Sequence, residues 1–155
     1  MLNTLLKGIQ RVHGSQPSRK LPITVDILCG IKCRLNLNCP NDIVFWAACM
    51  VAFYGLLRKS NLLPCSQRAF SADKHLCSGD LFKAPHGLAL RIKWSKTVQF
   101  KERSYFIPMP YLAAHPLCPA TALARLRLQH AHASSDAPLL VQPNGTPPYP
   151  ASFLG

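Results

Sequence analysis

The stretch IVFWAACMVAFYGLL (43–57) contains fifteen residues and no charge, and it lies between Asp42 and the pair Arg58 and Lys59. A membrane-spanning helix needs about 20 apolar residues. A shorter helix that is apolar on every side is instead typical of the centre of a hydrophobic core. We therefore expect a core helix over 43–57 that ends at Arg58 and Lys59, and no membrane span.

Helices are also expected before and after this segment. Thr24 has a side chain suited to an N-cap and predicts a helix that starts there. The expected buried face of that helix has four apolar residues: Ile27, Leu28, Ile31 and Leu35. Pro119 predicts the first turn of another helix, with Leu123 and Leu126 inward and Arg125 outward.

Between these helices the hydrophobic period changes to two. Apolar residues 88, 90, 92 and 94 alternate with a second set that includes Arg91 and Lys93, which predicts a strand with one apolar and one basic face. Tyr105, Ile107 and Met109 alternate again after a turn, so an antiparallel hairpin is expected. A short strand near Leu81 is also expected. The predicted fold class is α+β and mainly helical, with helices around a central apolar helix and a small antiparallel hairpin or sheet.

The composition indicates a folded and basic protein. The 155 residues are enough for one domain, or for one domain and a fragment of another, and 48% hydrophobic residues exclude a disordered chain. The 18 Lys and Arg against 6 Asp and Glu give a net charge of +12. This balance suits a polyanionic partner, most simply nucleic acid, and leaves an acidic substrate or an anionic membrane surface open.

The cysteines predict a reduced, intracellular protein. There are seven of them, no two have the Cys-x-x-Cys spacing, and no signal peptide precedes them. Cys29 and Cys33, with Cys39 or a histidine, are one alternative set of metal ligands, but buried free thiols are the better interpretation. We expect no metal and no cofactor. Residues 1–20 combine helical spacing with basic residues, which fits a mitochondrial presequence or an ordinary amphipathic helix.

Two cationic positions are candidates for chemistry. Arg58 follows the core helix, where a rigid element would hold its planar guanidinium ready for a phosphate. The alternative is that Arg58 and Lys59 only complement the helix C-terminus. Lys96 lies at the expected hairpin tip, where its ammonium could donate a proton or neutralise a phosphate. The alternative there is a solvated turn lysine.

These stretches, in this order, resemble the tyrosine recombinases, the family of phage integrases and Xer recombinases. FYGLLRKSNLL (53–63) is similar to the box around the first catalytic arginine of that family. IKWSKTVQF (92–100), followed by Ile107 and Pro108, is similar to the β-hairpin that carries the catalytic lysine. LCPATAL (117–123) and PLL (138–140) resemble later segments, and the character is that of eukaryotic mobile-element recombinases of the DIRS or Crypton type.

The resemblance implies a reaction and roles for Arg58 and Lys96. In this family a tyrosine attacks a DNA phosphodiester without a metal or nucleotide cofactor. Arg58 would be the first phosphate-binding arginine and Lys96 the acid that protonates the leaving oxygen. The expected DNA-binding residues are Arg58, Lys59, Arg91, Lys93 and Lys96. Residues 1–20 would be the end of a preceding helical DNA-clamping domain with its linker, and 21–155 a partial, truncated catalytic core.

The chain also departs from the family pattern. Asn61 stands where the family often has glutamate, and none of the six histidines has an arginine three residues later. The nucleophile would come after Gly155, because Tyr54, Tyr105 and Tyr149 fall in the wrong elements. The sequence therefore indicates the front portion of a recombinase catalytic domain.

Three functional hypotheses follow. The first is binding of double-stranded DNA by a protein of recombination and integration ancestry, located in the nucleus, with a homo-oligomer on DNA left open and no small-molecule substrate. The second is a non-catalytic basic module that binds RNA or an acidic protein. The third is recombinase activity with a tyrosine donated by another chain.

Overall fold

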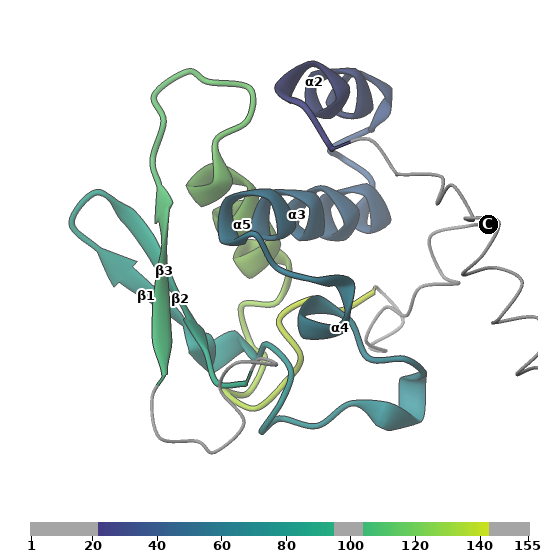
Figure 1. The fold of residues 1–155 in the computed structure, drawn as a ribbon, viewed down its shortest axis with the longest axis vertical. Coiled ribbons are helices and arrows are strands. Elements are labelled where there is room, and N and C mark those ends of the chain that lie inside the picture. Colours follow the sequence, from purple (N-terminus) through teal and green to yellow (C-terminus); the bar gives the residue numbers. More distant parts are fainter. Residues whose placement is uncertain (1–21, 95–103, 143–155) are drawn as a thin grey trace, which may run out of the picture.

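A computed structural model describes residues 22–94 and 104–142. The described fold is α+β, as the sequence predicts, with helices packed on one face of a three-stranded antiparallel sheet (Figure 1). In chain order the elements are α2 (Val25–Arg34), α3 (Pro40–Gly55), α4 (Lys59–Leu62), the 3-10 turns η1 (Gln67–Ala69) and η2 (Ser78–Asp80), β1 (Leu81–Ala84), β2 (Gly87–Ile92), β3 (Tyr105–Pro110) and α5 (Pro119–Gln129).

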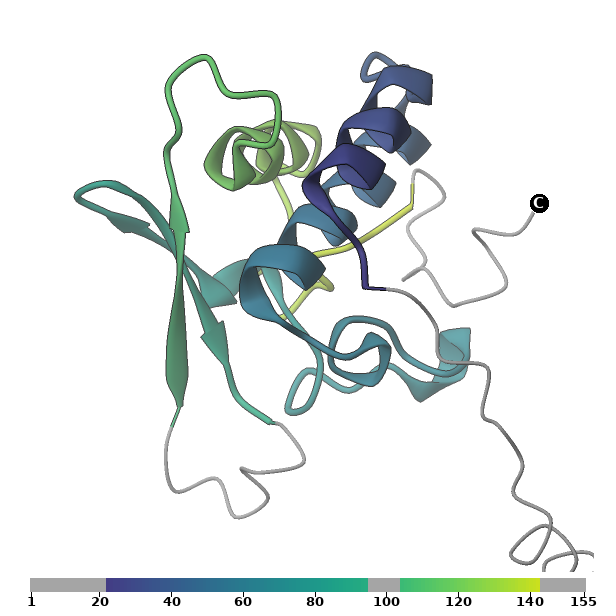
Figure 2. The ribbon, with the colours of Figure 1, turned by 45° about the horizontal axis from the view of Figure 1, so that its top comes forward.

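Helix α3 is the expected core helix, and it lies between two apolar clusters. Val44 and Val51 pack in a cluster shared with the sheet and α5, whereas Trp46 and Met50 pack in one shared with α2. The two views of the ribbon agree with this arrangement, because α3 runs between α2 and the sheet (Figures 1 and 2). A helix covered on both sides needs apolar residues all round, which explains the uncharged run.

The end of α3 differs from the prediction. The helix ends at Gly55, and Leu56 adopts the left-handed conformation with φ 48°. The N–H of Leu57 then donates to the carbonyl of Ala52 at 3.1 Å, which caps the last turn. Arg58 is therefore outside α3, and the chain has already changed direction before it reaches this residue.

Helix α2 begins at the predicted cap. The N–H of Ile27 donates to Thr24 Oγ1 at 3.4 Å, so the N-cap prediction is confirmed. The predicted buried face is wrong for Ile27, which is 47% exposed, and right for Leu28, which is 1% exposed. Since α2 contacts the core along a narrow stripe, Leu28 occupies the stripe and its neighbour Ile27, about 100° further round the helix, faces outward.

The sheet has the order β1-β2-β3, so the expected hairpin gains the short strand predicted near Leu81. Strand β2 ends at Ile92, which leaves Trp94 outside it although the alternation continues that far. Leu90 and Met109 are fully buried on the face that meets the helices, together with Leu123 and Leu126 of α5.

The segment after α5 closes on the turn before the sheet. Cys77 and Pro138 form an antiparallel bridge. The N–H of Ser78 donates to the carbonyl of Ala137 at 2.8 Å, and the N–H of Gly79 donates to that of Ser135 at 2.8 Å. These bonds hold η2, the turn that carries Asp80, against a part of the chain more than fifty residues further on.

Several expectations fall outside the described residues. They include the helix and linker assigned to 1–20, Lys96 at the hairpin tip and Tyr149. Within the described ranges, all seven cysteines are free thiols, and no cluster of His, Cys, Asp and Glu is arranged for a metal ion. None of the described helices has the length and apolar character to span a membrane.

Candidate nucleic-acid interface

Arg58 is exposed between the core helix and α4. It is the N-cap residue of α4, and its carbonyl accepts the N–H of Asn61 at 2.9 Å. Lys59, the first residue of α4, is also exposed. In residues 22–94 and 104–142 neither side chain forms an ion pair with an acid. The two cations are thus open to solvent on a backbone fixed by helices on both sides.

The position of Arg58 argues against one sequence-based alternative. In that alternative, Arg58 and Lys59 only complement the dipole at the C-terminus of the core helix. However, α3 ends at Gly55 and has no basic residue in its last turn. Both cations start the next helix instead, where positive charge is not favoured by the helix dipole.

Asn61 connects α4 to the end of β2. Its Nδ2 donates to the carbonyl of Trp94 at 3.2 Å. A glutamate at this position could not donate this hydrogen bond, because a carboxylate only accepts. The hydrogen bond therefore ties α4, the helix that Arg58 caps, to the chain just after β2.

A buried carboxylate holds Arg91 of β2 and Lys93, which lies just after this strand. Asp80 is fully buried, and its Oδ1 accepts from Arg91 Nε and Nη2, each at 2.9 Å. Its Oδ2 accepts from Lys93 Nζ at 2.7 Å and from the N–H of Cys77 at 2.8 Å. Four donors on two oxygens satisfy the carboxylate completely, which is the condition for burying a charge without a large penalty.

The electrostatics of this Asp80 cluster favour a charged lysine. Burial of Lys93 opposes its charged form, but hydrogen bonds to Asp80 and Cys77 outweigh burial and raise the Lys93 pKa above its ordinary value. Burial raises the pKa of the Cys77 thiol, while the hydrogen bond from Lys93 acts in the opposite direction. Lys93 therefore stays an ammonium and Cys77 a thiol near neutral pH.

The sequence predicts a basic strand face that includes Arg91 and Lys93, and in the structure an internal carboxylate binds both of these cations. Both are tied to Asp80, and their side chains are 38% and 22% exposed. Much of their charge is balanced inside the molecule. Only part of each side chain is therefore accessible to an external partner, whereas Arg58 and Lys59 are exposed.

The described tyrosines do not offer a prepared nucleophile. The hydroxyl of Tyr54 donates to the carbonyl of Leu117 at 3.0 Å. Burial, followed by the neighbouring Cys118, raises the pKa of Tyr54, so its phenolate is disfavoured. Tyr105 and Tyr111 are more than half exposed, at 53% and 62%.

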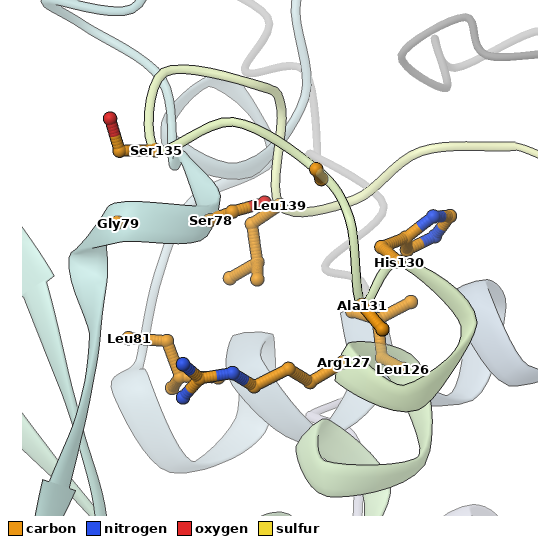
Figure 3. A pocket seen from close by; sticks show the side chains of 10 residues that line it. Ser78, Gly79, Leu81, Leu126, Arg127, His130, Ala131, Ser135 and Leu139 are labelled. Atoms are coloured by element: carbon orange, nitrogen blue, oxygen red, sulfur yellow. The ribbon is translucent and has the colours of Figure 1, made fainter.

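A small pocket lies between η2, the end of α5 and the segment after it (Figure 3). Its volume is about 280 Å³, just below the roughly 300–1,000 Å³ of ordinary ligand pockets. Arg127 extends across it toward Leu81, while the ring of His130 points away. The residues that line it include no carboxylate and no thiol, so it does not pair an acid with a base.

Sequence reasoning missed Asp80 and the role of Asn61. Asp80 precedes β1 in a loop-like segment, and nothing local distinguishes it from a solvated turn acid. One signal was present, because two cations, Arg91 and Lys93, alternate at the end of β2 and just after it, while an acid, Asp80, directly precedes the adjacent strand. The pairing of β1 with β2 brings these three residues together.

The chain matches no protein-family model, and no curated protein and no solved structure is significantly similar to it.

Proposed function

We propose that this protein binds double-stranded DNA through its phosphates, as a relative of the tyrosine recombinases that lacks part of their catalytic set. The observation that supports this most directly is the placement of Arg58. This guanidinium is exposed at the start of α4 and carries no internal counter-ion among the described residues, and Asn61 ties α4 to Trp94, just after β2.

The charge of the whole chain supports the same proposal. A net charge of +12 attracts a polyanion, and the strongest phosphate contacts require cations that are not already neutralised. Arg58 and Lys59 meet that requirement better than Arg91 and Lys93. In the proposed complex Arg58 and Lys59 contact the DNA backbone first, and Lys96, two residues after Trp94 along the chain, adds a further contact. Such contacts give affinity with little base specificity.

The experiment is a titration of a labelled duplex at two salt concentrations. Each phosphate contact contributes about 0.9 to the slope of log affinity against log salt. Arg58→Ala should lower this slope by about one contact and weaken binding at low salt roughly tenfold, the value of one charge-assisted hydrogen bond. Arg125→Ala is the matched control, because it removes the same charge from an exposed position on α5.

Two results would count against DNA binding. One is an affinity that does not change with salt, and the other is an equal effect of Arg58→Ala and Arg125→Ala. A parallel titration with RNA of the same length separates the alternative function. Tighter binding to RNA than to duplex DNA would favour the basic interaction module over the recombinase relative.

A further inference from the structure

The outer face of the sheet exposes aromatic rings next to a cation. In the described part of the chain, α3 and α5 cover one face of the sheet and no element covers the other (Figures 1 and 2). Phe82 of β1 and Phe106 of β3 are 38% and 60% exposed. Their ring centroids are 5.7 Å apart in an edge-to-face arrangement. Two large apolar side chains are thus left in water beside each other.

Strand register places Arg91 beside these rings. Arg91 pairs with Phe106 across β2 and β3, and its guanidinium carbon is 5.5 Å from the centroid of Phe82. Its Nε and Nη2 are bonded to the buried Asp80, so the guanidinium has a fixed orientation. The exposed part of the Arg91 guanidinium is therefore held in a fixed position next to aromatic rings.

The charge of this surface selects the partner. Of the cations near these rings, Arg91 and Lys93 share one buried acid, Asp80, which leaves the three groups with a net charge of +1 (two cations and one acid). Lys83 follows Phe82 on β1 and by strand alternation belongs to the opposite face. A face with exposed rings and an excess of positive charge complements a ligand that has flat apolar groups and negative charges together. Unpaired nucleotides have both, because the base stacks on the ring and the phosphate binds the cation.

We infer that this sheet face, formed by Phe82, Arg91 and Phe106, binds single-stranded DNA. A base stacks on the exposed ring of Phe106, and Arg91 contacts a phosphate beside it. The choice of DNA over RNA rests on the proposed function, because the same domain carries Arg58 for duplex DNA. The surface is separate from the Arg58 position, since the helices that support Arg58 lie on the opposite side of the sheet (Figure 1).

The test uses a single-stranded DNA oligonucleotide that contains one 2-aminopurine, whose fluorescence falls when the base stacks on a ring. We expect the full chain to quench it. Phe106→Ala should weaken binding about tenfold, the typical effect of losing one stacked base. Phe106→Trp should retain the affinity and Phe106→Leu should not, because leucine keeps the apolar character without the flat face. Since Phe106 is mostly exposed, these variants should fold, which circular dichroism checks.

Two variants serve as controls. Tyr111→Ala removes another exposed ring, which lines an open groove between the β1–β2 turn and α5, and should leave the affinity unchanged. Arg58→Ala should weaken duplex binding and leave single-strand binding intact. If the wild-type chain binds no duplex but quenches the single strand in a way that depends on Phe106, only the proposed function fails. If the wild-type chain binds duplex but Phe106→Ala has no effect on the single strand, only this inference fails.

Three outcomes would overturn the inference. The first is quenching that is equal in the wild-type chain and in Phe106→Ala. The second is tighter binding of the same sequence as RNA. The third is a dimer in sedimentation that Phe106→Ala converts to a monomer, because the face would then be covered by a second copy of the chain.

Discussion

Replacing Asp80 with asparagine should destabilise the fold strongly. The two carboxylate oxygens receive four hydrogen bonds, from Arg91, Lys93 and the backbone of Cys77. The asparagine amide offers one oxygen, and its NH2 group faces donors in place of the other. At least two donors therefore lose their acceptor, and the cations lose their counter-charge.

The size of the effect follows from how far the partners are buried. Removing one member of a buried ion pair costs about 3–5 kcal/mol. Arg91 and Lys93 are 38% and 22% exposed, so water can replace part of what they lose. We therefore expect the lower end of the range, about 3 kcal/mol. For a chain of this size that loss lowers Tm by roughly 6–12 °C.

The assay is urea unfolding followed by tryptophan fluorescence, because Trp46 is 3% exposed and reports the loss of the core. Asp136→Asn is the control, since it removes the same charge from an exposed site and should change stability by less than about 0.5 kcal/mol. If Asp80→Asn costs no more than Asp136→Asn, the carboxylate does not hold the strand cations as described.

Three further predictions concern backbone, pH and thiols. Gly87→Ala should cost more than about 1 kcal/mol in urea unfolding, because Gly87 has φ 148° and a Cβ would lie 2.3 Å from a carbonyl of β3; an unchanged midpoint would refute the close approach. Burial, aided by neighbouring lysines, lowers the pKa of His75 below its ordinary 6.5 although a hydrogen bond to Ser71 opposes this. The unfolded chain then binds the proton first, so stability should fall as pH decreases through 6.5, and His75→Gln should flatten that fall in unfolding curves at several pH values. Burial raises the pKa of Cys49 to about 11. Mass spectrometry after iodoacetamide treatment should therefore find Cys49 labelled later than the exposed Cys33, and equal labelling would contradict this.

Local signals in the sequence were enough for most elements. The uncharged run predicts α3, the alternation predicts β2 and β3, and the side chain of Thr24 predicts where α2 starts. Each signal depends on residues within a few positions, and burial on one or both sides is its cause. The predicted end of α3 was wrong because Leu56, a residue with a Cβ, takes the left-handed conformation that usually belongs to glycine.

The candidate site was predictable only in part. The exposure of Arg58 follows from its place after a core helix, and sequence reasoning identified it. The pairing of Asp80 with Arg91 and Lys93 depends on the β1–β2 register, which no short pattern in this chain specifies. Asn61 appeared as a departure from a family pattern, and its bond to Trp94 becomes visible only when α4 and β2 are placed together.

The contacts between segment 135–139 and η2 also bear on when this part of the fold can form during synthesis of the chain. A ribosome delivers Arg91 and Lys93 well before it delivers Ala137 and Pro138, whose backbone contacts the turn that leads to Asp80. The last contacts around that turn therefore form only after both cations have been made. The surroundings of Asp80 are completed late in translation, although Asp80 and its two partners are made early.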